Sequence, residues 1–246
     1  MKRVKTGIPG FDPLVQGGFP YGSSILITGS PGTGKSIFGI QYIYNGATKY
    51  GEKGLYVSFE QRKDDIINQA SQFGWNLNNP KIEVLTIPIT QVRGETVEFI
   101  KEKIKKEKIK RVVIDSLTTL TVNAPIYSST KDVAIKDVIS ESTVFSPPII
   151  GDYLVKHFIY AFIESLQQVE DATAVLISEN SNEPGFLSRD TVSEFACDGV
   201  VVINFESLGG DFSRTMIVRK MRQTKNDEDV HPVEISDKGL IVHKIE

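Results

Sequence analysis

Short apolar runs recur along the chain, and most of them are apolar on both faces. Helical patterns separate these runs. The apolar runs are rich in Val, Ile and Leu and occupy residues 24–28, 55–59, 82–87, 111–115, 174–178 and 199–205. The helical patterns lie at 35–49, 62–73, 95–108 and 151–169. Runs of this kind are typical of buried parallel strands, and their alternation with helices predicts an α/β fold with helices on both faces of a mostly parallel sheet.

The pattern changes after the run at 199–205. Strand-like stretches at 212–221, 230–235 and 240–244 follow with only turns between them. They predict antiparallel strands that extend one edge of the sheet. Because no Ser/Gly-rich linker and no internal repeat divides the chain, we expect one domain over residues 1–246.

One long segment fits neither pattern. Residues 122–150 lie between a predicted strand and a predicted helix and contain clusters of Pro, Ser and Thr. Their middle part, 131–140, carries at best a short amphipathic helix. Long segments of this kind are typically functional loops, so we expect an inserted surface flap.

Composition narrows the function classes. The 246 residues carry 28 Lys and Arg against 31 Asp and Glu, a net charge of −3. This near balance argues against an acidic membrane or the nucleic-acid backbone as the main partner, although a local basic patch stays compatible with it. Cys197 is the sole cysteine, and His157, His231 and His243 lack ligand spacing, which disfavours a zinc site. The N-terminus has no apolar signal region and no 18-residue apolar run occurs, so we expect a soluble, cytoplasmic protein.

Residues 29–36, GSPGTGKS, fit the phosphate-loop pattern G-x-x-x-x-G-K-[ST] between a predicted strand and a predicted helix. The glycines let backbone N–H groups turn toward a bound anion at a helix N-terminus. Lys35 would reach the β- and γ-phosphates, and the Ser36 hydroxyl would bind Mg²⁺. The alternative is a glycine-rich turn that binds nothing. The predicted nucleotide-binding residues are Ser30, Pro31, Gly32, Thr33, Gly34, Lys35, Ser36 and Ile37.

Two carboxylates follow predicted buried strands. Asp115 ends the run 111–115 and would join Ser36 in the magnesium shell; the alternative is a helix N-cap. Glu60 follows the run 55–59, at the edge where ligands collect in open α/β sheets. It could orient the attacking water, or it could be a solvated residue that caps the next helix. Position alone leaves both roles for Glu60 open.

Several motifs in order resemble KaiC-like ATPases of the RecA/RadA superfamily. The resemblance runs from about residue 5 to about residue 243, and only 122–150 lacks a counterpart. It rests on residues 6–36, 38–46, 54–60, 73–75, 111–116, 176–180, 192–201 and 218–225. It implies a RecA-like core that binds ATP or ADP with Mg²⁺ between neighbouring subunits of a homo-oligomeric ring, usually a hexamer.

The resemblance also implies roles for single residues. Lys35 and Ser36 match the phosphate-loop pair, and Asp115 matches the Walker B aspartate. Glu60 matches the first of two adjacent carboxylates associated with hydrolysis, but the second is Gln61 here, which predicts slow turnover.

Further roles follow from the C-terminal motifs. Ser178 and Glu179 match a segment that senses the nucleotide state, and Lys220 and Arg222 match cations that reach a neighbour's phosphates. Strand alternation independently places Lys220 and Arg222 on one face. Without the resemblance, an exposed basic edge that discourages aggregation is the simpler interpretation.

The leading hypothesis is therefore an oligomeric ATPase with Glu60, Lys35, Lys220 and Arg222 as its catalytic residues. One alternative is a DNA-binding, recombinase-like ATPase that uses the basic run 101–111 and the insertion, although the charge balance disfavours nucleic acid. Another is a nucleotide-dependent scaffold or regulator with little turnover, for which Gln61 is the argument. The sequence identifies no other protein partner.

Overall fold

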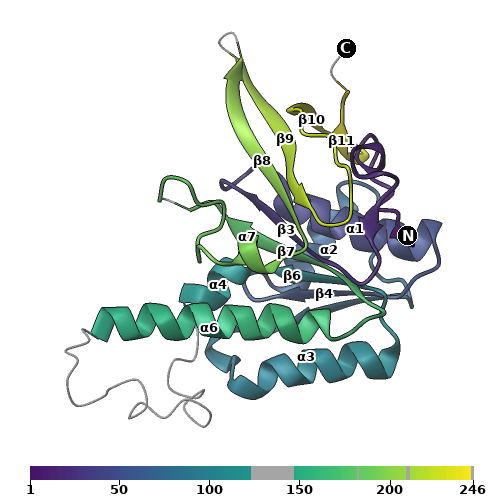
Figure 1. The fold of residues 1–246 in the computed structure, drawn as a ribbon. Coiled ribbons are helices and arrows are strands. Elements are labelled where there is room, and N and C mark those ends of the chain that lie inside the picture. Colours follow the sequence, from purple (N-terminus) through teal and green to yellow (C-terminus); the bar gives the residue numbers. More distant parts are fainter. Residues whose placement is uncertain (123–146, 182, 209–210, 245–246) are drawn as a thin grey trace.

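A computed structural model describes residues 1–122, 147–181, 183–208 and 211–244. Its centre is a nine-stranded sheet in the order β11-β10-β9-β8-β3-β7-β6-β4-β5 (Figure 1). The parallel strands are β3 (Ser24–Gly29), β4 (Gly54–Ser58), β5 (Ile82–Thr86), β6 (Arg111–Asp115), β7 (Thr173–Glu179) and β8 (Gly199–Leu208). The antiparallel edge is formed by β9 (Asp211–Met221), β10 (His231–Ser236) and β11 (Gly239–Val242). The predicted α/β class, with its antiparallel C-terminal edge, is confirmed.

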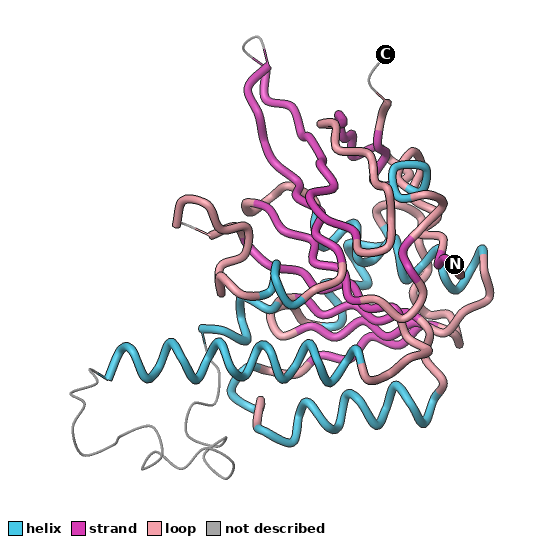
Figure 2. The backbone as a smooth tube through the Cα atoms, in the orientation of Figure 1, coloured by secondary structure: helices cyan, strands magenta, loops and turns pink. Residues whose placement is uncertain are grey.

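Helices cover both faces of the sheet, as Figure 2 shows. On one face α1 (Lys35–Lys49) and α2 (Lys63–Ser71) pack through residues such as Phe38 and Ile66. On the other face α3 (Gly94–Glu107) and α6 (Pro147–Gln167) pack through Ile100 and Phe162. Each parallel strand therefore contributes alternate side chains to two apolar cores, which explains why these strands are apolar on both faces.

The structure corrects both boundaries of the predicted flap. Helix α6 begins at Pro147, so residues 147–150 belong to a helix rather than to a loop. Proline is tolerated in a first helical turn, where its missing N–H has no intrahelical partner. Residue 122 likewise ends the short helix α4 (Leu117–Val122). The rest of the predicted flap, 123–146, lies outside the described residues.

The elements that the sequence pattern misses are short. A two-residue ladder joins β1 (Arg3–Val4) to β2 (Phe19–Pro20). Single turns form η1 (Asp12–Val15), η2 (Ile89–Gln91) and α7 (Ser193–Ala196). Elements of this length contain too few residues to show a hydrophobic period.

Parallel pairing brings the ends of four strands to one edge of the sheet. Gly29 pairs with Glu179 across β3 and β7, and Ser58 pairs with Asp115 across β4 and β6. The loops that follow these strands therefore meet at the carboxyl edge, where ligands bind in open α/β sheets. Among the described helices, none is both long and apolar enough to cross a membrane.

Candidate functional site

The predicted phosphate loop connects β3 to α1. Gly32 and Gly34 take φ values of 81° and 103°, a region that glycine adopts without strain. Thr33 is buried, and its hydroxyl donates to the Ser30 carbonyl at 2.9 Å. Pro31 lies in the same turn, and Ile37 lies in the first turn of α1. All eight predicted nucleotide-binding residues are therefore contiguous in one strand–turn–helix unit.

Lys35 lies buried beneath this loop. Its Nζ donates to the carbonyl oxygens of Gly29 at 2.8 Å and Ser30 at 2.9 Å. Burial lowers the pKa of the Lys35 ammonium group, while the carboxylates of Glu179, Asp115 and Glu60 oppose that shift. A lysine held in such a position is a strong local donor for an anion.

Asp115 is a buried carboxylate, with 4% of its surface exposed. The Tyr56 hydroxyl donates to its Oδ2 at 2.5 Å, and the Ser36 side chain lies close to the carboxylate. Burial raises the pKa of Asp115, and the interactions with Tyr56 and Ser36 counter that rise. The two predicted magnesium ligands, Ser36 and Asp115, thus lie together.

Oxygen donors of this kind suit magnesium, which usually binds through one or two protein oxygens together with substrate phosphates and water. Within the described residues, no group of three or more His, Cys, Asp or Glu side chains forms a cage for a metal. The donor set therefore fits an ion held jointly by the protein and a nucleotide.

Glu60 lies at the same edge, just after β4. The hydroxyls of Ser116 and Thr119 both donate to its Oε1 atom. Within the described residues, Arg62 is the N-cap of α2, and no side chain caps that helix there. Glu60 is therefore not a helix cap. It is an oriented carboxylate that faces the turn after Asp115.

The end of β7 completes this edge. Thr118 Oγ1 accepts a hydrogen bond from the Glu179 N–H at 2.8 Å and lies 3.3 Å from the Ser178 hydroxyl. Arg189 pairs with the Glu179 carboxylate at 3.0 Å. These contacts link the turn after β6 to the strand that carries the predicted sensing residues.

Lys220 and Arg222 lie together at the other end of the strands, near the amino end of β8. Lys220 pairs with Val200, three residues before the position on β8 that pairs with Gly29 of β3. This offset is about 10 Å along the strands. Lys220 Nζ donates to the carbonyl of Cys197 at 2.6 Å, at the amino end of β8.

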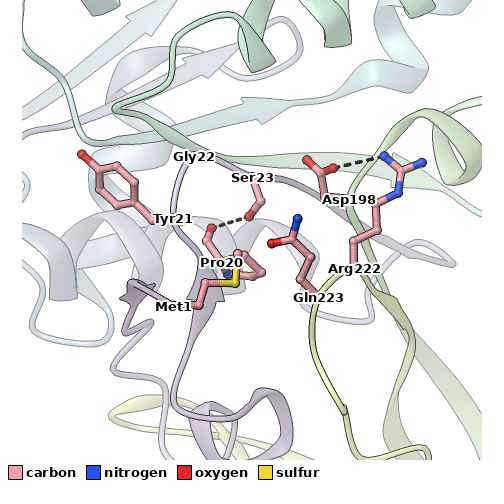
Figure 3. A pocket seen from close by; sticks show the side chains of 8 residues that line it. All are labelled: Met1, Pro20, Tyr21, Gly22, Ser23, Asp198, Arg222 and Gln223. Carbon is pink, nitrogen blue, oxygen red and sulfur yellow. Dashed lines mark hydrogen bonds and ion pairs between the residues drawn. The ribbon is translucent and has the colours of Figure 1, made fainter.

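Arg222 occupies the same amino edge. It pairs with Asp198 at 3.2 Å beside a surface hollow that is lined by Ser23 and Gln223, among others (Figure 3). Since its contacts and those of Lys220 are to the segment before β8, both cations point away from the phosphate loop of their own chain.

Three contributors to the carboxyl edge escape prediction from sequence: Tyr56, Ser116 and Thr119. In the sequence, Tyr56 is one more bulky residue in a predicted buried strand. Only its hydroxyl group indicates that it could contact a polar site. Ser116 and Thr119 follow Asp115 directly in the sequence, so a search for hydroxyls after the strand could have found them.

Comparison with known proteins shows which sequences this chain is similar to. The family sequence model described as "ATPase: KaiC" matches residues 4–138 and 126–246. A UPF0273 protein of Pyrococcus furiosus is 30% identical over an alignment that covers 99% of this chain and 94% of that protein. A circadian clock oscillator protein KaiC of Prochlorococcus marinus is 32% identical over an alignment that covers 98% of this chain and 46% of that protein.

A solved structure agrees with these sequence relatives. The crystal structure of a KaiC-like protein from Pyrococcus horikoshii OT3 matches with a TM-score of 0.76 at 31% identity, covering 99% of both chains. The mostly parallel sheet with antiparallel edge strands is therefore a RecA-like fold, as the sequence motifs predict.

Proposed function

The chain belongs to the KaiC family of ATPases, and from this membership we propose that it binds Mg-ATP and hydrolyses it slowly between neighbouring copies of itself. Its family and fold are those of a nucleotide-binding ATPase. The observation that carries the proposal is the convergence of Lys35, Ser36, Glu60 and Asp115 at one edge of the sheet.

The phosphate loop and α1 would hold the nucleotide. Lys35 would exchange its carbonyl partners for the β- and γ-phosphates, and backbone N–H groups of residues 30–37 would surround them. Ser36 and Asp115 would hold a magnesium ion, which when bound neutralises charge on the phosphates.

Glu60 would orient the attacking water and accept its proton. The hydrogen bonds from Ser116 and Thr119 to one carboxylate oxygen fix the side chain and leave Oε2 as the candidate base. Gln61 follows where the resemblance implies a second carboxylate, and an amide cannot act as a base. Slow hydrolysis is therefore our expectation.

Lys220 and Arg222 support a shared site. The phosphate loop lies at the carboxyl ends of the parallel strands. The two cations lie near the amino end of β8 and point away from that loop. Head-to-tail contact between copies would bring the loop and the cations together, and such contacts close into rings. A homohexamer is the ring that we propose.

Part of the basic run that would serve the DNA-binding alternative is paired with carboxylates. Within the basic run, Lys103 pairs with Glu83 at 2.9 Å and with Glu107 at 2.6 Å. Lys101 lies 3.5 Å from Glu98. These pairs reduce the positive charge that part of this run would present to a phosphate backbone.

The test is ATP binding and hydrolysis by the purified protein, with and without single-stranded DNA at a fixed salt concentration, together with its mass in solution. We expect Mg-dependent binding, slow turnover that DNA leaves unchanged, and an oligomer. Strong stimulation by DNA would favour the recombinase-like alternative. Binding with no turnover would favour a nucleotide-dependent scaffold or regulator.

A further inference from the structure

Tyr56 lies on β4 beneath the start of α1. It pairs with Val113 of β6, two residues before the pair Ser58 and Asp115. Its ring is buried and packs against α1, where a Cβ placed on Gly39 would lie 3.5 Å from Tyr56 Cε2. Helix and strand therefore hold the ring in one place, and the hydroxyl extends along the strand toward Asp115.

The hydroxyl contacts one of the two predicted magnesium ligands and lies beside the other. It donates to Asp115 Oδ2 at 2.5 Å, and the Ser36 side chain is close to it. One phenol thus ties β4 to the end of β6, next to the first turn of α1.

A tyrosine at this position needs an explanation beyond packing. Phenylalanine would fill nearly the same volume, and a buried hydroxyl costs free energy unless it finds a partner. Here the partner is a carboxylate that is itself buried and needs a donor. The pair satisfies both groups and fixes the carboxylate plane beside Ser36.

We propose that Tyr56 is a positioning residue that orients Asp115, beside Ser36, for the magnesium ion that accompanies the nucleotide. This inference rests on the proposed function. Outer partners that orient metal ligands typically contribute 10- to 100-fold in metal affinity. The loss of the Tyr56 hydroxyl should therefore lower the affinity for magnesium in the nucleotide complex. The affinity for the nucleotide without magnesium should stay the same.

The test is Tyr56→Phe, which removes one hydroxyl and keeps the ring. Binding of a fluorescent, non-hydrolysable ATP analogue is titrated with MgCl₂ and is also measured in EDTA. We expect the half-saturating magnesium concentration to rise on the order of tenfold. Affinity in EDTA and the melting temperature should stay close to those of the wild type.

Tyr42→Phe is the matched control. Tyr42 is a buried tyrosine on α1, whose hydroxyl donates to the Thr173 carbonyl at 3.3 Å, away from the magnesium ligands. Its loss should leave the magnesium requirement unchanged. An equal shift in both variants would overturn the proposal, because it would indicate general loosening of the core.

A second variant tests the route through Asp115. In an Asp115→Asn background the carboxylate that Tyr56 orients is gone, so adding Tyr56→Phe should change the magnesium requirement no further. Additive effects would overturn the proposal, as would a Tyr56→Phe protein with the wild-type requirement. If instead the wild type binds no Mg-nucleotide at all, the proposed function itself fails, so the two failures are distinguishable.

Discussion

Arg222 donates from Nη1 to the Oδ1 atom of Asp198 in its own chain, at 3.2 Å. The other oxygen of Asp198 accepts the Ser24 N–H at 2.9 Å, so the carboxylate is fixed to the start of β3. About half of the Arg222 side chain, 53%, remains exposed. The arginine is thus held near the amino end of β8 with a large part of its side chain accessible to a neighbouring molecule.

This arrangement gives a first prediction. Arg222→Ala should bind ATP normally but hydrolyse it on the order of 10³-fold more slowly, because a cation from a neighbour stabilises charge on the transferring phosphoryl group. Steady-state phosphate release and nucleotide titration measure the two effects. Arg93→Ala is the matched control, since Arg93 is exposed and donates to carbonyls of its own loop. Wild-type turnover in Arg222→Ala would remove this arginine from the site.

Lys35→Ala should lose tight binding of Mg-ATP. Charge-assisted hydrogen bonds contribute roughly 2–3 kcal/mol, so the Kd should rise about 100-fold. The ammonium also contacts two loop carbonyls, so the melting temperature must be compared alongside calorimetric titration. Lys49→Ala, at the other end of α1, should bind nucleotide as the wild type does. Unchanged affinity in Lys35→Ala would contradict the phosphate-loop assignment.

Glu60→Gln should retain nucleotide binding and lose roughly 10²- to 10⁴-fold in turnover, because the amide keeps the shape of the side chain and loses the base. The Ser116 and Thr119 hydroxyls can still donate to the amide oxygen, so the side chain should keep its place. Single-turnover hydrolysis with bound ATP separates this effect from binding. Equal rates in variant and wild type would exclude Glu60 as the base.

The sequence predicts best what depends on neighbouring residues. Apolar runs such as 111–115 predict the strands, and residues 29–36 predict the phosphate loop, because both patterns are local in the sequence. Helix α1 spans the residues that the pattern predicts, 35–49, because its apolar face repeats over several turns.

What escapes prediction depends on contacts between distant residues. Tyr56 meets Asp115 across 59 positions of sequence, and only the register of β4 against β6 brings them together. The pairing of Arg222 with Asp198 likewise needs the hairpin of β8 and β9. The pairing registers of β4 with β6 and of β8 with β9 cannot be predicted from a single sequence. The residues that orient the predicted ligands can therefore be identified only in the fold.

Cys197 gives a prediction about reactivity. It is buried, and burial raises the pKa of its thiol well above the usual range. Because the thiolate is the reactive form, a raised pKa lowers reactivity at any pH near neutrality. The folded protein should therefore react slowly with a thiol reagent at pH 8 and quickly in denaturing urea. Rapid native labelling would show that the amino end of β8 opens.

The shared-site model makes the sharpest prediction. One chain would supply Lys35, Ser36, Glu60 and Asp115, and the next would supply Lys220 and Arg222. Glu60→Gln and Arg222→Ala should each hydrolyse ATP poorly alone, yet a mixture should recover part of the activity. Some interfaces in mixed oligomers would pair an intact Glu60 with an intact Arg222, whereas two groups acting within one chain could not complement each other. Subunit exchange is verified first, by energy transfer between labelled chains, and a double variant mixed with wild type serves as the control for dilution. No recovered turnover after proven exchange would refute the shared site and would return Lys220 and Arg222 to the role of an exposed basic edge.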